Sequence, residues 1–230
     1  MVSQDVLALI LVYSLIVVAL AICIIKLHIN PNSDIRKIVH IIIGNFVFIW
    51  WMFSDWWIMD IFFTIPFIII LLYVILKKDK SSVIGKATSE ASNTGLLFYA
   101  VSIAVLVTFF FNHFVAASVG IVAMTYGDSM GNIIGKRYGK HKIIHDKSLE
   151  GSLAVFIFTA IMGFIVITFY SYLIATGNYS FSSADAIIPA WIICIFAGTF
   201  ASIIELFTPG NIDNLLVPIG ITVLLCLLGM

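Results

Sequence analysis

Long apolar stretches dominate the chain, and short polar segments separate them. Eight such stretches can be delimited: Val6–Ile25, Ile38–Phe53, Trp56–Leu76, Thr94–Phe111, Phe114–Ile134, Ser152–Ala175, Ala186–Phe207 and Leu215–Met230. A helix of about 20 apolar residues crosses the hydrocarbon core of a bilayer, and the runs are continuous rather than alternating as in barrel strands. The pattern therefore predicts an all-α, polytopic transmembrane helical bundle. The second and last stretches are short for full spans, so we expect seven or eight membrane crossings, in a single domain covering residues 1–230.

The composition agrees with a membrane protein. Hydrophobic residues make up 62% of the chain and charged residues 10%, whereas a soluble domain carries roughly a quarter charged residues. The residues before the first stretch contain no basic group, so we expect the first helix to be retained rather than cleaved as a signal peptide. The three cysteines lie in or at the ends of apolar stretches and form no disulfide or metal-binding pattern.

The basic residues lie on one side of the predicted bundle. All twelve Lys and Arg residues fall between stretches 1 and 2, 3 and 4, or 5 and 6. Because successive helices alternate in direction, these three loops share one face of the membrane. The positive-inside rule makes that face cytoplasmic and places both termini outside. We therefore expect an integral membrane protein whose polar site faces the cytoplasm.

The segment Gly127–Ser152 departs most from the apolar pattern. It holds five of the twelve basic residues, and glycines recur at every fourth position, at Gly127, Gly131, Gly135 and Gly139. Such a repeat lets two transmembrane helices pack closely. Because glycine has no side chain, the same repeat also lets a phosphate chain approach the backbone closely. Packing explains the first two glycines well and the continuation Lys136, Arg137, Tyr138 and Gly139 poorly, which favours a mixed role.

Asp128 follows a continuous apolar run and stands beside Ser129 near the predicted cytoplasmic boundary. A carboxylate in this setting suits a Mg²⁺ ion that accompanies a nucleoside triphosphate. The alternative is a hydrated carboxylate at a helix end. The glycine-rich, basic neighbourhood favours the metal ligand.

Lys147, Ser148, Glu150 and Gly151 precede or begin the sixth stretch. Ser148 and Glu150 match a helix-capping pattern. Alternatively, Lys147 neutralises phosphate while the free amides of the first helical turn bind anionic oxygens. The two interpretations are compatible.

Two further segments carry polar residues to the same predicted face. Arg36 and His40, four residues apart, share one helix face next to Lys37, where they either anchor the helix at the interface or orient a phosphate or lipid hydroxyl. Glu205, Asp213 and Asn214 lie in a loop without basic residues. Asp213 or Asn214 either caps the last helix or, with Glu205, holds a metal or accepts a hydroxyl proton. Glu90 also falls near this face.

Together these segments resemble the polyprenol kinase family, which includes dolichol kinases, phytol kinases and CTP-dependent diacylglycerol kinases. The residues that carry the resemblance are Arg36-Lys-x-x-His40, the glycine-rich stretch from Gly127-Asp128 to Gly139-Lys140, Lys147-Ser148-x-Glu150-Gly151-Ser152, and Glu205 followed by Asp213-Asn214-x-x-Val-Pro218. Gly131 stands where the family usually has alanine. The resemblance covers most of the chain.

The resemblance implies a CTP-dependent, Mg²⁺-dependent kinase that phosphorylates a membrane lipid alcohol of the polyprenol, phytol or diacylglycerol type. It implies catalytic roles for Asp128, Glu205, Asp213 and His40, the first three holding the metal. It further implies that the glycines, Ser129, Asn214 and the basic and capping residues described above bind the nucleotide.

The main alternative is a cytidylyltransferase that makes a CDP-lipid, and a small transporter is a remote one. No nucleic-acid partner is expected, and a homodimer is left open. The lipid itself is not predicted.

Overall fold

The computed structural model describes residues 3–30, 35–77, 85, 94–144, 147–177 and 188–230. These residues are helical almost throughout, and their one β-type contact is an isolated bridge between Lys142 and Ser148. The α-helices are α1 (Ser3–Ile29), α2 (Arg36–Gly44), α3 (Trp56–Met59), α4 (Ile65–Leu76), α6 (Gly95–Phe110), α7 (Phe114–Val122), α8 (Ser129–Tyr138), α9 (Leu149–Ala175), α10 (Ala190–Phe207) and α11 (Asp213–Leu227). Three 3₁₀ segments, η1 (Asn45–Phe48), η2 (Trp50–Met52) and η4 (Phe111–His113), and two π-helical segments, η3 (Asp60–Thr64) and η5 (Ala123–Asp128), connect them.

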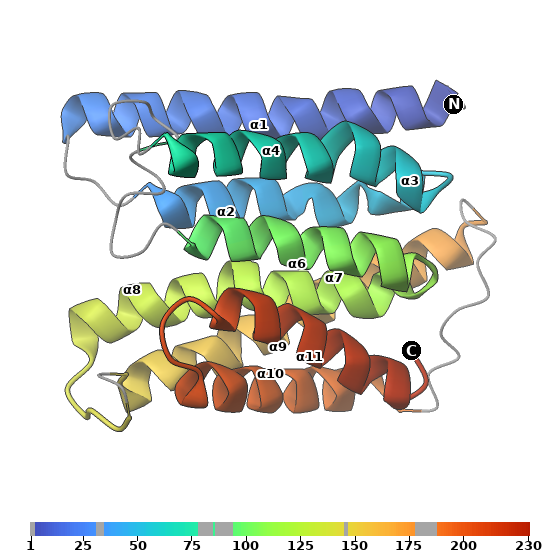
Figure 1. Ribbon diagram of the computed structural model, residues 1–230. Coiled ribbons are helices and arrows are strands. Elements are labelled where there is room, and N and C mark those ends of the chain that lie inside the picture. Colours follow the sequence, from blue (N-terminus) through green and yellow to red (C-terminus); the bar gives the residue numbers. More distant parts are fainter. Residues whose placement is uncertain (1–2, 31–34, 78–84, 86–93, 145–146, 178–187) are drawn as a thin grey trace. The chain divides into compact units, whose positions relative to one another are not determined.

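All eight predicted stretches contain helix (Figure 1). The second differs most, because α2 ends at Gly44 and two 3₁₀ turns replace its second half. The Asn45 side chain donates to the carbonyl of Ile41 at 2.7 Å and thereby competes with the helical hydrogen bonds. The fifth stretch continues beyond Ile134 to Tyr138 as α8.

Five helical stretches are long and apolar enough to cross a membrane: Ser3–Ile29, Trp56–Leu76, Gly95–Tyr138, Leu149–Ala175 and Ala190–Phe207. Gly95–Tyr138 contains 44 residues, and its backbone leaves the helical conformation at Phe110 and His113. Lys37–Phe48 and Asp213–Leu227 are shorter apolar helices. The protein is therefore an all-α integral membrane protein, as predicted. The number of crossings and the side on which the termini lie remain predictions.

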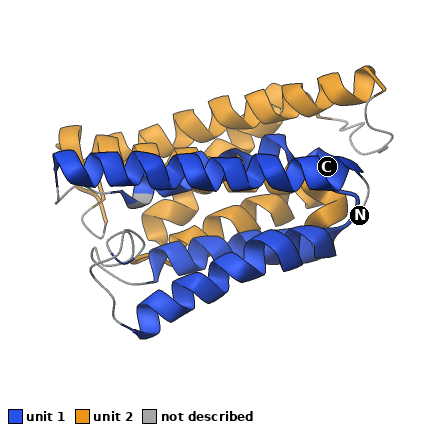
Figure 2. Ribbon diagram, turned by 90° about the horizontal axis from the view of Figure 1, so that it is seen from above, with its two compact units in different colours: residues 1–109 blue, residues 110–230 orange. Residues whose placement is uncertain are grey.

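The chain divides into two compact units, Met1–Phe109 and Phe110–Met230, which are coloured separately in Figure 2. The single-domain prediction stays a prediction, and we describe each unit by itself. In unit 1, buried polar side chains tie the helices together. Asp5 accepts hydrogen bonds from the amide and hydroxyl of Ser54, and Asp60 accepts from the hydroxyls of Thr64 and Thr108 at 2.6 and 2.7 Å.

Unit 2 is built around α9, which packs against α7, η5, α8 and α10, while α11 packs against α7 and α10. The helices α8, α9, α10 and α11 alternate in direction (Figure 1). One end of this unit therefore gathers the C-termini of α8 and α10 and the N-termini of α9 and α11. The opposite end holds the C-terminal residue, whose carbonyl oxygen lies 3.0 Å from Nδ1 of His113. The polar segments of unit 2 that were predicted to form a site meet at the first end.

Candidate functional site

Three carboxylates come together in unit 2. Asp128 ends the π-helical segment η5, Glu205 lies in the last turn of α10, and Asp213 begins α11. One carboxylate oxygen from each lies within 4.8 Å of the others. Asp128 and Asp213 are buried and Glu205 is half-buried. Residues separated by up to 85 positions thus form one compact anionic cluster, which we call the carboxylate cluster.

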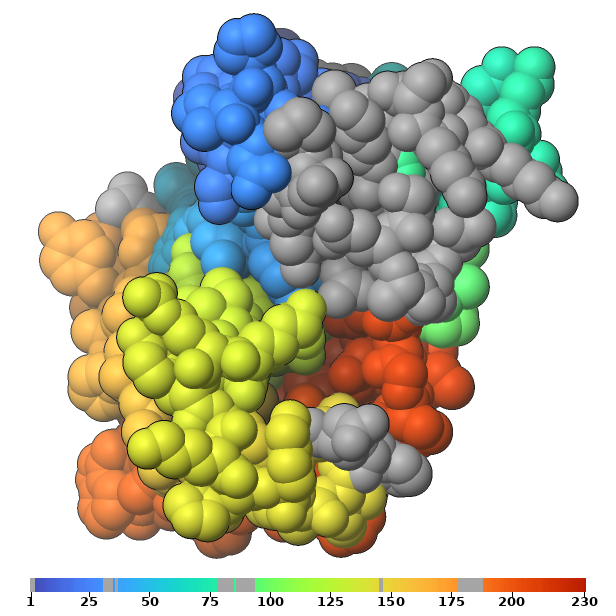
Figure 3. Space-filling view, turned by 90° about the vertical axis from the view of Figure 1, so that its left-hand side faces the viewer, coloured from blue at the N-terminus to red at the C-terminus, as the bar shows by residue number. Residues whose placement is uncertain are grey.

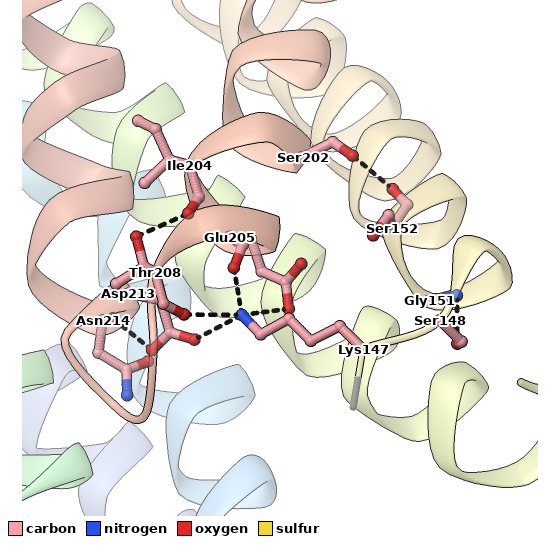
Figure 4. A network of polar contacts seen from close by, with 10 residues as sticks. All are labelled: Lys147, Ser148, Gly151, Ser152, Ser202, Ile204, Glu205, Thr208, Asp213 and Asn214. Carbon is pink, nitrogen blue, oxygen red and sulfur yellow. Dashed lines mark hydrogen bonds and ion pairs between the residues drawn. The ribbon is translucent and has the colours of Figure 1, made fainter. Parts of the chain in front are cut away.

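Lys147 reaches into the carboxylate cluster (Figure 4). Its Nζ lies 2.9 Å from Oε1 of Glu205 and 3.6 Å from Oδ2 of Asp213. The same ammonium also donates to the backbone carbonyls of Glu205 and Thr208. A side chain predicted to neutralise phosphate therefore neutralises protein carboxylates in this structure.

The segment before α9 directs Lys147 toward these partners. The amide of Ile143 donates to the carbonyl of Lys147, and the amide of Leu149 donates to the carbonyl of His141, both at 2.9 Å. Glu150 closes the same segment, since its Oε1 lies 2.7 Å from Nδ1 of His141. These contacts hold residues 141–143 beside residues 147–150. They thereby fix the backbone position from which the Lys147 side chain extends.

Ser148 caps α9. It has extended backbone angles, and its hydroxyl accepts a hydrogen bond from the amide of Gly151 at 3.2 Å. The capping interpretation is confirmed for Ser148, whereas Glu150 pairs with His141 instead of completing a capping box. Binding of phosphate by the amides at this helix start remains a prediction.

We expect Ser148→Ala to lower the free energy of unfolding by about 1 kcal/mol, because one amide of the first turn loses its acceptor. Thermal unfolding in a fixed detergent measures the effect. Ser148→Thr keeps the hydroxyl and serves as the control. An alanine variant as stable as the wild type would contradict the capping role.

The connection between α10 and α11 positions Asp213. Gly210 has φ +68°, a conformation that residues with a side chain rarely adopt, and it turns the chain after Pro209. The N-cap of α11 is Ile212, which forms no side-chain cap. Asp213 is therefore the first helical residue, and it accepts from the amide of Asn214 at 2.8 Å while its other oxygen faces Lys147. Asn214 itself is buried beside the carboxylate cluster.

The glycine strip lies against α9. A Cβ atom added to Gly127 would meet Thr159, and one added to Gly131 would meet Val155 and lie 3.1 Å from the carbonyl oxygen of Gly151. Added Cβ atoms on the last two glycines, Gly135 and Gly139, would meet Ser148. Close packing thus extends to all four glycines, whereas the sequence favoured a mixed role in which packing explained the first two well. A phosphate-binding role for them stays a prediction.

Lys136, Arg137 and Lys140 are exposed near the end of α8, and Ser129 at its start is buried. The end of α8 and the segment after it lie on the face of the molecule in Figure 3, coloured yellow-green to yellow. In contrast to these exposed side chains, Lys147 is largely buried and forms ion pairs with Glu205 and Asp213. Nucleotide binding by the exposed basic residues remains a prediction.

The predicted residues of the second stretch belong to unit 1. Lys37 and His40 are buried, and the His40 ring stacks on Tyr99 with centroids 4.2 Å apart. The Tyr99 hydroxyl donates to the backbone carbonyl of His40 at 3.1 Å. Arg36 begins α2, but its side chain and Glu90 lie outside the described residues. The roles of Arg36, Lys37 and His40 therefore stay predictions.

The carboxylate cluster fits a divalent cation. Its donors are carboxylate oxygens, which Mg²⁺ and Ca²⁺ prefer. Two oxygens bound directly to one Mg²⁺ ion lie at most about 4.2 Å apart, because each Mg–O bond is about 2.1 Å long. The observed spread of up to 4.8 Å requires small side-chain rotations or bridging water. Three carboxylates and one ammonium carry a formal charge of −2, which a divalent ion offsets.

Sequence reasoning missed three contributors to this end of unit 2. Thr208 supplies a carbonyl oxygen to Lys147, His141 pairs with Glu150, and the hydroxyl of Ser202 donates to the carbonyl of Ser152 at 2.9 Å. A backbone carbonyl has no sequence signature. His141 and Glu150 are nine residues apart across a loop, a spacing that no helical or strand period singles out.

Comparisons with known proteins point to one family. A phytol kinase from a Synechocystis species is 30% identical over 202 residues, which cover 85% of this chain and 79% of that protein. A probable chloroplastic phytol kinase of Triticum aestivum is 26% identical over 196 residues, and phytol kinase 1 of Arabidopsis thaliana, also chloroplastic, is 28% identical over 157 residues. The matched regions span 64% and 52% of these plant proteins, less than two thirds of their length. The chain matches no family model and no solved structure.

Proposed function

Since the chain belongs to the phytol and polyprenol kinase family, we propose that it is a lipid-alcohol kinase that transfers the γ-phosphate of CTP to the hydroxyl of an isoprenoid or related membrane lipid. The single observation that carries the proposal is the carboxylate cluster with Lys147 at its edge. Acidic oxygens and a lysine side by side supply what phosphoryl transfer requires, namely a metal site and a cation for phosphate. CTP as the donor rests on the motif resemblance.

The chain's own residues have distinct parts in this reaction. Asp128, Glu205 and Asp213 would hold Mg²⁺. The residues that orient the triphosphate are Ser129, Asn214, Lys136, Arg137, Lys140 and Lys147. Bound there, Mg²⁺ would supply positive charge that offsets the negative charge developing during transfer. A carboxylate of the cluster accepts the proton of the lipid hydroxyl. Catalysis by such a site is mostly positioning and electrostatic stabilisation.

The location of the carboxylate cluster suits a substrate anchored in the bilayer. The cluster lies at the ends of long apolar helices, and one end of unit 2 carries its polar segments. The acceptor hydroxyl can meet the nucleotide there while the isoprenoid chain stays in the membrane. By the positive-inside rule, we propose that this end faces the cytoplasm.

The test uses purified protein in lipid nanodiscs with Mg²⁺ and CTP labelled on the γ-phosphate. Phytol, geranylgeraniol, a polyprenol and diacylglycerol are offered in parallel, and ATP, GTP and UTP replace CTP in matched reactions. We expect labelled lipid phosphate from CTP and at least one isoprenoid alcohol. In a parallel reaction with a lipid phosphate as acceptor and CTP labelled on the α-phosphate, release of pyrophosphate together with a labelled CDP-lipid would identify a cytidylyltransferase instead. No transfer from any nucleotide to any alcohol would contradict the kinase.

A further inference from the structure

Lys147 and a metal ion draw on the same carboxylate groups. The ammonium is held by Oε1 of Glu205 at 2.9 Å, Oδ2 of Asp213 at 3.6 Å and the carbonyl of Thr208 at 3.2 Å. Glu205 and Asp213 are also two of the three residues that can hold a divalent cation. Because like charges a few ångströms apart repel strongly away from bulk water, a metal bound at these carboxylates weakens the hold of the ammonium on them.

The Lys147 side chain can exchange partners by rotation about its own bonds. Its segment is fixed at the base by the hydrogen bonds around Ile143 and Leu149, so the backbone origin stays in place while four rotatable bonds can redirect the ammonium. The side chain is largely buried, with 18% of its surface exposed. An ammonium displaced from its carboxylates in such a place needs another anion, because an unpaired charge away from water is costly.

We propose that Lys147 is a resident counter-cation of the carboxylate cluster and changes places with the metal during the catalytic cycle. Without ligands, its ammonium neutralises Glu205 and Asp213 and holds α10 and α11 at their observed spacing. A divalent ion takes over both carboxylates, and the released ammonium turns to the triphosphate oxygens. This inference rests on the proposed function, since it requires metal and nucleotide at one site.

The exchange predicts that the binding of the metal ion and the binding of the nucleotide are thermodynamically coupled. Metal alone must displace Lys147 and leave it without a partner, whereas metal with nucleotide supplies the new partner. Each ligand therefore raises the affinity for the other, and this coupling is reciprocal. The arrangement weakens metal binding in the absence of nucleotide without abolishing it.

The first test follows the reactivity of lysines in the wild-type protein. Brief acetylation followed by peptide mass spectrometry reports the modification of Lys147 relative to Lys142, an exposed lysine of the same segment. We expect Mg²⁺ alone to raise the modification of Lys147 severalfold relative to Lys142, and further addition of CTP to lower it again. An unchanged or lower ratio with Mg²⁺ would overturn the proposal.

The second test measures Mn²⁺ binding, from the electron paramagnetic resonance signal of the free ion, in wild type, Lys147→Met and Lys142→Met. We expect Lys147→Met to bind Mn²⁺ about tenfold more tightly in the absence of nucleotide, because it lacks the competing cation. Lys142→Met removes the same charge and should match the wild type. Equal or weaker binding by Lys147→Met, or a wild type that binds no Mn²⁺, would overturn the exchange.

The results of these two tests can be distinguished from the result of the kinase assay. If the wild type transfers phosphate but neither the acetylation of Lys147 nor the Mn²⁺ affinity of Lys147→Met changes as expected, the protein is a kinase without the exchange. If both expected changes occur but no phosphate is transferred, the exchange stands and the proposed kinase reaction is wrong.

Discussion

Asp213→Asn is expected to slow phosphoryl transfer by about a hundredfold or more while leaving the helical fold intact. Asparagine keeps the size of the side chain but removes one of three negative charges from the metal site. Removing one such electrostatic group typically costs about 10²–10³ in rate. Label transfer from CTP at saturating lipid, with circular dichroism as a check on folding, measures this effect.

The metal dependence provides a second readout for the same variant. We expect Asp213→Asn to need a higher Mg²⁺ concentration for half-maximal rate, since the remaining oxygens bind the ion more weakly. Asp55→Asn is the matched control, because Asp55 is an exposed acid in unit 1 outside the carboxylate cluster. An Asp213→Asn protein with wild-type rate and wild-type Mg²⁺ dependence would remove Asp213 from the metal site.

Gly131→Leu is expected to destabilise unit 2 by about 3 kcal/mol or more, near the upper end of overpacking effects in well-packed cores. A Cβ at this position already meets the Val155 side chain and lies 3.1 Å from the carbonyl oxygen of Gly151. A side chain can rotate away, but the helix backbone of α9 cannot move without separating the two helices. Thermal unfolding in detergent measures the loss, and Ile133→Phe adds volume at an exposed position of α8 as the control.

A graded series at the same position tests the packing explanation. Gly131→Ala should cause a smaller loss, because it adds one methyl group against Val155 and Gly151 rather than a whole leucine side chain. Adding Val155→Ala should recover part of that loss, since directly contacting residues give non-additive effects. Purely additive effects of the two changes would argue against the contact, and a stable Gly131→Leu protein would argue against close packing of α8 on α9.

The helices were largely predictable because their signal is local. Each apolar stretch contains its own reason to be helical in a membrane, since no water is available to satisfy backbone groups outside a helix. Departures occur where one side chain changes local hydrogen bonding, as Asn45 does at the end of α2. The π-helical segment η5, which precedes α8 and ends at Asp128, has no comparable signature in residue pattern.

The residues of the site were predictable, but their partners were not. Asp128, Lys147, Glu205 and Asp213 all stand out as polar groups at the ends of apolar stretches. Phosphate was the expected partner of Lys147, whereas the structure pairs it with two of the carboxylates. The sequence pattern shows that these groups share one face, but it holds no information on which of them are within bonding distance.

The amino-acid sequence by itself determined the all-α membrane character of this protein and the set of polar segments from which a site can be built. Both follow from transfer of side chains between water and lipid, which depends on each stretch separately. Only the tertiary structure decided that the glycine strip packs on α9, that Asp128, Glu205 and Asp213 form one cluster, and that Lys147 lies between the carboxylates of the latter two. Such contacts join residues tens of positions apart, and their formation depends on how the helices pack rather than on any single segment.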